Sequence, residues 1–282
     1  MISTGRAFFK MSGSGNDFVM VDARTEPPGS LAEPSMVQRV CARATGIGAD
    51  GIVFLEPSTT AAVKLNYLNA DGSPADLCGN ATLCTTRLAV ELGFVEAAGF
   101  GIETPSGIIQ ARLVGGRPSI DLQPVVDVRG SADGIEPQSG ERRVGYATVG
   151  VPHIVIRCDD VSTVDVVGRG RRLRHHPTMP NGANVNFVAR NGAGRWRMRT
   201  YERGVEAETL ACGSGSVATA ILLETWAETA TSRAEGEVPA PTELETTSGR
   251  ILSVELRRRA DAWMPTLSGE ARVVFQGVIA EL

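Results

Sequence analysis

Lysine is scarce in this sequence, and so is net positive charge. Lysine occurs only at positions 10 and 64 of the 282 residues, and the formal net charge is −4. A protein whose main partner is nucleic acid usually presents a basic face to the phosphates. We therefore expect no nucleic-acid partner.

Long apolar runs are also missing. The longest uncharged, apolar-rich run spans 209–223. It is shorter than the roughly 20 residues that a membrane-spanning helix needs, and Gly and Ser dilute it. The first ten residues hold no apolar core of the kind that a signal peptide carries. We expect no membrane partner and a cytoplasmic location.

The cysteines lack the pattern of a disulfide framework or a zinc site. There are five, an odd number, in a chain that is large for a disulfide scaffold. Structural zinc usually shows two tight ligand pairs, and none is visible here. We expect free thiols and no metal. The cysteines are Cys41, Cys78, Cys84, Cys158 and Cys212.

The length and the polar segments predict two domains. A chain of 282 residues exceeds most single domains. The segment 127–143 is polar and rich in Gly and Pro, so we place the boundary there. The predicted domains are 1–128, to which a last strand at about 271–282 returns, and 129–270. Alternating strands and helices predict an α+β fold. Among the predicted helices are 35–43, which Ser35 would cap, 81–92, which Gly93 would end, and 213–226.

A pattern of strand, polar residue, cysteine and helix occurs twice. In each case the cysteine follows the polar residue by nine or ten positions and stands at the start of an apolar helix. The two copies are 64–68, Asn69, Cys78 and 197–201, Glu202, Cys212.

Two further similarities support a duplication. The sequence Glu-Thr-Pro-Ser-Gly-Ile at 103–108 resembles Glu-Thr-Thr-Ser-Gly-Arg at 245–250, and 16–19 resembles 184–188. We infer two copies of one α+β unit, each a mixed sheet around a central helix. A pseudo-twofold axis would face their equivalent loops across one cleft, where we expect the active site.

A thiol at a helix N-terminus is chemically useful. The positive end of the helix dipole lowers the pKa of a cysteine, and the free N–H groups there bind a carboxylate. If two such ends share one substrate carboxylate, one thiolate removes the α-proton and the other thiol returns a proton to the opposite face. A single buried cysteine is more often a small apolar side chain, which is our expectation for Cys41, Cys84 and Cys158.

The motifs that carry this pattern resemble the signature of diaminopimelate epimerase from about residue 9 to 279. The matching segments are 11–18 (Met-Ser-Gly-Ser-Gly-Asn-Asp-Phe), 46–51 (Gly-Ile-Gly-Ala-Asp-Gly), 69–73 (Asn-Ala-Asp-Gly-Ser), 78–80 (Cys-Gly-Asn), 184–187 (Asn-Val-Asn-Phe), 201–204 (Tyr-Glu-Arg-Gly) and 211–215 (Ala-Cys-Gly-Ser-Gly).

The resemblance implies a pyridoxal-independent epimerase of lysine and peptidoglycan precursor synthesis. Such an enzyme interconverts LL- and meso-diaminopimelate with no cofactor, on two similar α+β domains with the site between them, and is often a homodimer. The implied roles cover twelve residues. Cys78 and Cys212 would be the acid–base pair, tuned by His153 and Glu202. Gly79, Asn80, Gly213 and Ser214 would hold the reacting carboxylate, and Asn16, Asn69 and Asn184 would contact substrate. Glu202 and Arg203 would bind the distal amino and carboxylate groups.

The chain departs from the family pattern at the substrate end. Val151 stands where many members have Asn, and Gly51 where some place a substrate-binding Gln. Ala81 replaces a common Gly, and 204–209 is one residue longer than usual. Two alternatives stay open. One is a racemase of another amino acid on the same fold, which would lose the distal Glu202 and Arg203 contacts. The other is a non-catalytic two-thiol protein that binds a ligand or senses redox state.

Overall fold

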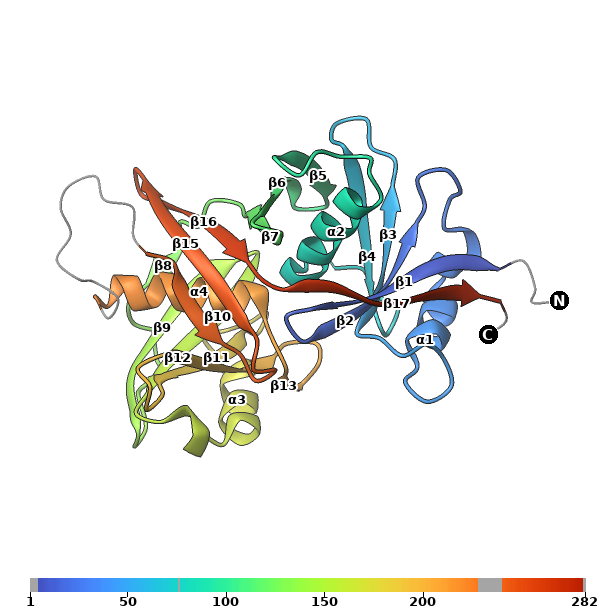
Figure 1. The fold of residues 1–282 in the computed structure, drawn as a ribbon. Coiled ribbons are helices and arrows are strands. Elements are labelled where there is room, and N and C mark those ends of the chain that lie inside the picture. The colour runs from blue at the N-terminus through green and yellow to red at the C-terminus, as the bar shows by residue number, and fades with distance from the viewer. Residues whose placement is uncertain (1–4, 76, 228–239, 281–282) are drawn as a thin grey trace. The chain divides into compact units, whose positions relative to one another are not determined.

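The structure is a computed structural model that describes residues 5–75, 77–227 and 240–280 (Figure 1). Contacts within the chain divide it into two compact units. Unit 1 comprises Met1–Asp121 and Ser268–Leu282, and unit 2 comprises Leu122–Leu267. No helix in the described residues combines the length and apolar character needed to cross a membrane.

Unit 1 is a mixed sheet with two α-helices. The sheet runs in the order β17, β1, β2, β3, β4, β5, β6, β7; the β2–β3 and β4–β5 pairs are parallel and the others antiparallel. The elements are β1 (Arg6–Gly13), β2 (Asn16–Asp22), a short 3₁₀ turn η1 (Gly29–Ala32), α1 (Pro34–Cys41), β3 (Gly51–Glu56), β4 (Val63–Asn69), α2 (Gly79–Glu91), β5 (Phe100–Thr104), β6 (Gly107–Val114), β7 (Arg117–Asp121) and β17 (Ala271–Ile279).

Unit 2 repeats this topology. Its sheet runs β8, β9, β10, β11, β12, β14, β15, and its parallel pairings, β10–β11 and β12–β14, are again the third and the fifth along the sheet. The elements are β8 (Val128–Arg129), β9 (Glu141–Val149), β10 (Val151–Cys158), a 3₁₀ turn η2 (Val161–Thr163), α3 (Val166–Arg174), β11 (Asn184–Arg190), β12 (Trp196–Glu202), β13 (Ala207–Thr209), α4 (Gly213–Thr225), β14 (Thr242–Glu245), β15 (Ile251–Arg259) and β16 (Ala262–Ser268).

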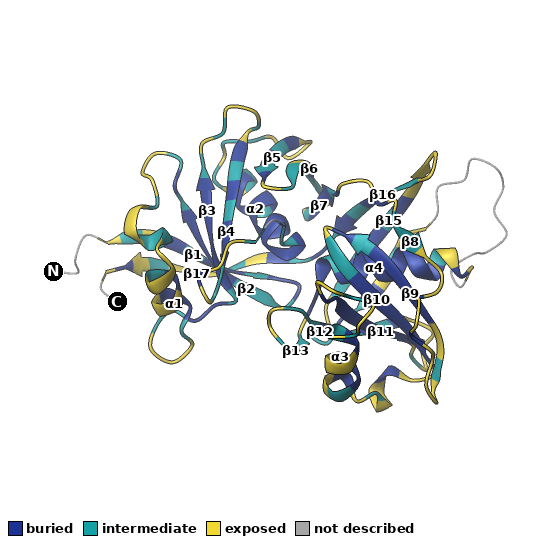
Figure 2. Cartoon of the chain, turned by 180° about the vertical axis from the view of Figure 1, so that it is seen from behind, coloured by how far each residue is buried: buried dark blue, intermediate teal, exposed yellow. Residues whose placement is uncertain are grey.

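Each sheet wraps around one central helix. Helix α2 contacts β1, β2, β4, β6, β7 and β17, and α4 contacts β8, β9, β10, β11 and β15. Both helices are buried along most of their length (Figure 2). Their small side chains, Ala, Gly, Ser and Thr, let the strands approach from several sides. The predicted α+β class, with a mixed sheet around a central helix in each half, is confirmed.

The opposite sheet faces have their own cores. In unit 1, α1 packs Val37 and Val40 against Ile52 and Phe54 of β3. Because β3 is buried on both faces, its sequence reads as a continuous apolar run. In unit 2 the corresponding core includes Leu173 of α3.

Two local predictions need correction. Helix α1 begins one residue earlier than predicted, with Glu33 as N-cap and Pro34 in the first turn, so Ser35 is not its cap. The similarity of 16–19 to 184–188 also does not match equivalent strands. By its parallel pairing with β10, β11 corresponds to β3, while β2 corresponds to β10.

Candidate active site

The first of the two predicted cysteines stands at the beginning of α2 in unit 1. Cys78 is the N-cap, in extended conformation, and Gly79 and Asn80 are the first two helical residues. Cys78 is half-buried, whereas Asn80 is only 2% exposed. An N-cap cysteine places its sulfur next to the backbone N–H groups that have no partner within the helix. This arrangement can stabilise an anion on the sulfur or on a bound carboxylate.

The second predicted cysteine is placed in the same way at the beginning of α4 in unit 2. Cys212 is the N-cap and is 5% exposed. Its Sγ accepts a hydrogen bond from the Gly215 N–H at 3.4 Å, and Ser214 Oγ lies 3.7 Å from the same sulfur. Here the helix N-terminus directly donates to the thiol sulfur.

Both cysteines occupy equivalent positions because the strands before them are equivalent. In unit 1, Asn69 of β4 pairs with Gly51 of β3. In unit 2, the β11–β12 register that pairs Val185 with Tyr201 continues to Asn184 and Glu202. Asn69 and Glu202 are therefore counterparts, as are Gly51 and Asn184.

Asn16 and Asn80 are brought together at the α2 end. The Asn80 Nδ2 donates to Asn16 Oδ1 at 2.6 Å, and the Asn16 Nδ2 donates to Asp50 Oδ2 at 2.9 Å. Asn69, by contrast, lies in a turn in which its Nδ2 donates to Ser73 Oγ at 3.1 Å. Its amide thus has a structural role in that turn.

Asn184 and Arg203 are brought together in unit 2. The Asn184 Oδ1 accepts from the Arg203 backbone N–H at 2.7 Å, and the Arg203 guanidinium donates to the carbonyl of Asn181 at 3.2 Å. Glu202 ends β12, where its Oε2 accepts from Thr209 Oγ1 at 2.8 Å. Adjacent positions therefore present a carboxylate and a guanidinium.

The longer segment 204–209 has a structural explanation. Glu206 adopts a positive φ of 58° and bonds to Arg174 at 2.9 Å and to the Tyr201 hydroxyl at 3.2 Å. Burial acts to raise the pKa of Glu206, but its bonds to Gly204, Arg174 and Tyr201 outweigh that effect and lower the pKa. The longer turn is thereby held against α3 by Glu206.

His153 is fully buried behind α4. Its Nδ1 lies 3.2 Å from the Asn186 Nδ2, which donates to it, and Asn186 Oδ1 accepts from Thr200 Oγ1 at 3.0 Å. Burial, with a smaller contribution from the Arg203 charge, lowers the pKa of His153 to about 3, although the Val149 carbonyl acts in the opposite direction. His153 is therefore neutral near pH 7, and its charge is not available to stabilise a thiolate.

Asn186 is a buried polar residue for which the sequence motifs predict no role. Its side chain packs against the first turn of α4, since a Cβ added to Gly215 would lie 2.3 Å from Asn186 Oδ1. The sequence does contain a signal for such a role, because Asn186 is a polar residue between Val185 and Phe187 in a buried strand.

The space beside Gly51 is occupied. A Cβ at this position would lie 2.4 Å from the Tyr67 ring and 2.5 Å from the Leu68 carbonyl oxygen. Tyr67 is 7% exposed and stacks edge-on against Phe18. Glycine at position 51 is thus required by the packing of Tyr67.

The other three thiols are buried, as expected from the sequence. Burial raises the pKa of Cys41 to about 11 and of Cys158 to about 12, and raises the pKa of Cys84 well above its usual value. These side chains are protonated, apolar parts of the core.

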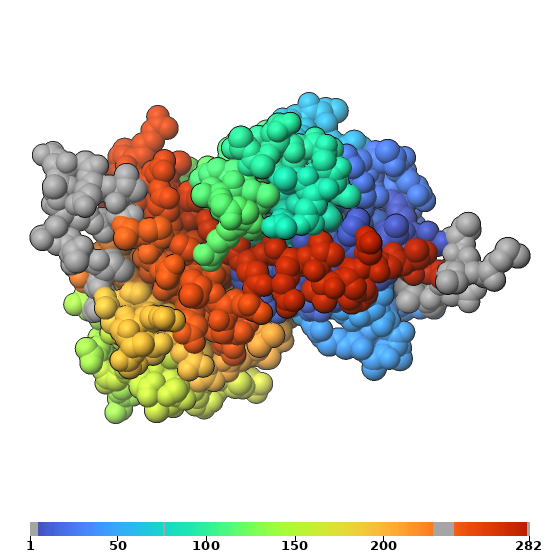
Figure 3. Space-filling model, in the orientation of Figure 1, coloured from blue at the N-terminus to red at the C-terminus, as the bar shows by residue number. Residues whose placement is uncertain are grey.

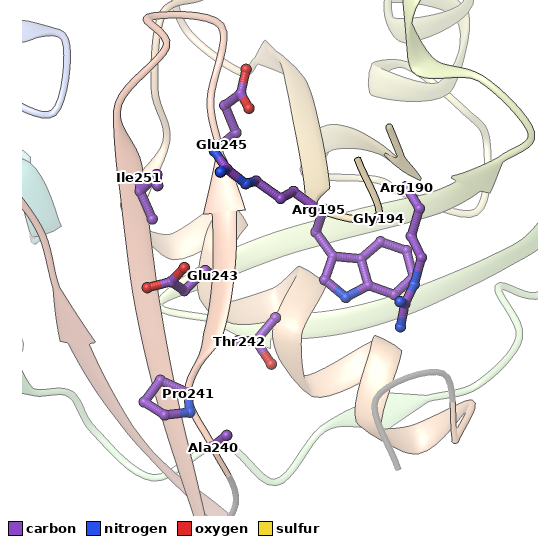
Figure 4. Close-up of a pocket in the computed structure, with 10 residues that line it drawn as sticks. Arg190, Gly194, Arg195, Ala240, Pro241, Thr242, Glu243, Glu245 and Ile251 are labelled. Atoms are coloured by element: carbon purple, nitrogen blue, oxygen red, sulfur yellow. The ribbon is translucent and has the colours of Figure 1, made fainter. Parts of the chain in front are cut away.

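A pocket of about 320 Å³ lies elsewhere in unit 2, at the beginnings of β12 and β14 (Figure 4). The Arg190 guanidinium there lies 4.5 Å from the centre of the Trp196 ring. Glu243 and Glu245 also line the pocket. It contains none of the residues predicted to form the active site.

The buried His153 predicts acid destabilisation. Because its pKa is about 3 in the folded protein and near 6.5 when unfolded, the unfolded chain binds more protons between these values. Stability is therefore lost as pH falls from 6.5 towards 3. Between pH 7 and pH 5 we expect a loss of about 2 kcal/mol from this group. Denaturant unfolding of the wild type and of His153→Gln at both pH values measures this loss of stability. An equal change in the free energy of unfolding in the two proteins would contradict the prediction.

Comparisons with known proteins agree with this geometry. The family model for diaminopimelate epimerase matches residues 8–121 and 145–252. A diaminopimelate epimerase of Gemmatimonas aurantiaca is 48% identical over 98% of this chain and 100% of its own length. One of Aquifex aeolicus is 36% identical over 97% of this chain and 98% of its own. In fold, the chain resembles a PhzF-family phenazine biosynthesis protein of Bacillus anthracis, with a TM-score of 0.68 at 17% identity over 98% of this chain and 99% of that one.

Proposed function

This chain belongs to the diaminopimelate epimerase family, and from that premise we propose that Cys78 and Cys212 carry the two proton transfers of its reaction. The reaction interconverts LL- and meso-diaminopimelate in lysine biosynthesis. A stereocentre is inverted when a proton leaves one face of the α-carbon and another arrives at the opposite face. Two groups, one basic and one acidic, are therefore needed.

The observation that carries the proposal is the repeated N-cap cysteine. Cys78 precedes Gly79 and Asn80 at α2, and Cys212 precedes Gly213 and Ser214 at α4. In each case the helix terminus offers N–H groups to the carboxylate attached to the reacting carbon. Hydrogen bonds to that carboxylate stabilise the negative charge that develops when the α-proton is removed.

The proton balance follows from this arrangement. One cysteine acts as thiolate and takes the α-proton, becoming a thiol. The other, a thiol, donates its proton to the carbanion from the opposite face and becomes the thiolate. No net proton is gained or lost, and the reverse reaction exchanges the roles of the cysteines.

Other residues would recognise the rest of the substrate. The distal ammonium suits the Glu202 carboxylate, and the distal carboxylate suits the planar guanidinium of Arg203. The hydrogen bond that the Arg203 backbone N–H donates to Asn184 Oδ1 supports this turn. Asn16 and Asn69 would contact the substrate on the unit 1 side. His153, being neutral, would influence Cys212 through Asn186 and the first turn of α4.

The activity is tested by turnover of LL-diaminopimelate beside a panel of amino acids with one stereocentre, in D₂O and without added cofactor. We expect conversion to the meso form and deuterium at the α-carbon of the product, detected by NMR and mass spectrometry. Turnover of the panel instead of diaminopimelate would favour the racemase alternative. Product without deuterium would contradict proton exchange through the thiols.

We also propose that the protein is a homodimer, and that β17 forms part of the contact. This strand carries three large apolar side chains that are about half exposed, Val274, Phe275 and Val278, and it lies at the surface in the view of Figure 3. Such a cluster is typical of an interaction site. Light scattering after size-exclusion chromatography should give a molar mass of twice the 29.8 kDa chain mass. In the double variant Phe275→Ser/Val278→Ser the molar mass should fall towards that of one chain. A monomeric wild type would exclude the dimer.

A further inference from the structure

Four charged side chains form a neutral cluster behind Asn16. Lys10 bonds to Asp17 at 2.6 Å and also to the Gly48 carbonyl, while Arg43 bonds to Asp17 at 2.9 Å and to Asp50 Oδ1 at 2.5 Å. Burial acts to raise the pKa of Asp17, but the bonds from Arg43 and Lys10 outweigh it and lower the pKa. Asp17 is therefore a carboxylate near neutral pH, and the carboxyl groups of both Asp17 and Asp50 are paired with the Arg43 guanidinium.

Asp50 connects this cluster to the candidate site. Its Oδ1 accepts from Arg43, and its Oδ2 accepts from the Asn16 Nδ2 at 2.9 Å and from the Asp17 N–H at 3.2 Å. An ionised carboxylate only accepts hydrogen bonds. Asn16 must therefore turn its NH₂ group towards Asp50.

The orientation of Asn16 decides that of Asn80. With its NH₂ facing Asp50, Asn16 presents its carbonyl oxygen to Asn80, so Asn80 must donate with its own NH₂. The carbonyl oxygen of Asn80 is then left over. Within the described residues Asn80 Oδ1 has no hydrogen-bond partner, although the residue is only 2% exposed.

A buried acceptor without a donor is unfavourable unless a ligand supplies one. Asn80 is the second residue of α2, beside Cys78. The reacting centre of an amino acid carries a carboxylate, which suits the helix N–H groups, and an ammonium, which has only donors. The free carbonyl oxygen of Asn80 matches the ammonium.

We propose that Asp50 is a positioning residue of the reaction: through Asn16 it orients the Asn80 amide so that a carbonyl oxygen faces the ammonium of the reacting centre. This inference rests on the proposed function of the α2 end. It adds a role for Asp50 and a second role for Asn80, besides its backbone N–H.

Asp50→Ala tests the proposal because it removes the acceptor that fixes the Asn16 amide. The Asn16 and Asn80 amides can then reverse, so that an NH₂ group faces the ammonium. We expect KM for diaminopimelate to rise by roughly 10- to 100-fold, the effect of losing a bond to a charged group, with a smaller change in kcat. The ammonium is bound in both ground and transition states, so KM takes most of the loss.

Asp17→Asn is the matched control. Asp17 belongs to the same charge cluster and bonds to both of its cations, Lys10 and Arg43, but within the described residues its side chain makes no hydrogen bond to Asn16. KM in this variant should stay near the wild-type value. An equal rise in KM in Asp17→Asn and Asp50→Ala would assign the effect to lost charge and overturn the proposal.

A second pair of variants remains informative if Asp50→Ala does not fold. In Arg43→Gln/Asp50→Asn the amide oxygen is released from Arg43 and can again accept from Asn16, so KM should be close to that of Arg43→Gln alone. In Arg43→Gln/Asp50→Ala the acceptor is gone, and KM should rise by roughly tenfold or more. Equal KM in the two double variants overturns the proposal. A wild type without epimerase activity would instead overturn the proposed function.

Discussion

Replacing Cys78 or Cys212 with alanine is expected to reduce kcat/KM for diaminopimelate by about 10²- to 10⁴-fold or more, to the level of background. Each variant removes one of the two groups that exchange a proton with the α-carbon, and a positioned acid or base commonly contributes a factor of this size. Because a two-base reaction needs both groups in every turnover, the two single variants should be equally inactive, and the double variant should be little worse.

The matched control is Cys158→Ala. This thiol is buried in β10, and its pKa is raised to about 12, mainly by burial, so it cannot act as a base near neutral pH. The variant should lose some stability through a small cavity but keep its kcat/KM. Progress curves for LL- and meso-diaminopimelate, with thermal unfolding of each protein, separate loss of chemistry from loss of fold. Sustained turnover in Cys78→Ala or Cys212→Ala would contradict the two-base proposal.

Gly215→Ala is expected to lower both stability and activity. Helix propensity alone predicts the opposite, because alanine in a helix is favoured over glycine by up to about 1 kcal/mol. The added Cβ would lie 2.3 Å from Asn186 Oδ1 and 3.1 Å from the Cys212 sulfur. Asn186 cannot easily move, since it is fully buried and bonded to His153, Ile154 and Thr200.

We therefore expect Gly215→Ala to be destabilised by about 1–3 kcal/mol, the usual cost of overpacking, and to lose at least about tenfold in kcat/KM. The loss of activity follows because a small displacement of a catalytic group has a large effect on rate. Gly192→Ala serves as the control, since no atom lies within 4 Å of its Cβ position. Unchanged activity in Gly215→Ala would mean that the first turn of α4 does not position the reacting groups.

Much of the fold was predictable because it depends on local patterns. The helices α2 and α4 were predicted from the sequence, and Gly93 does follow the end of α2 with a positive φ of 72°. The prediction that Ser35 caps α1 was wrong because proline suits the first turn of a helix. The helix therefore begins at Pro34, one residue before Ser35, and Glu33 is its N-cap.

The equivalence of strands was harder to predict. Residues 16–19 and 184–188 look alike because both begin buried strands with asparagine, but similar composition does not determine which strand lies beside which. The parallel pairing of β10 with β11, and of β2 with β3, shows that β10 corresponds to β2 and β11 to β3. The role of the two cysteines, and of the other site residues, stays a prediction that the variants above test.

The sequence by itself determined the family, the α+β class and the two N-cap cysteines, because these depend on residue types at fixed spacing along the chain. Only the tertiary structure decided the packing of Tyr67 beside Gly51 and of Asn186 beside Gly215, and the bonds from Asp50 through Asn16 to Asn80. Those contacts join strands and helices that are 16 to 64 residues apart. The direction of each amide depends on which charged group lies behind it, and no local pattern in the sequence encodes that choice.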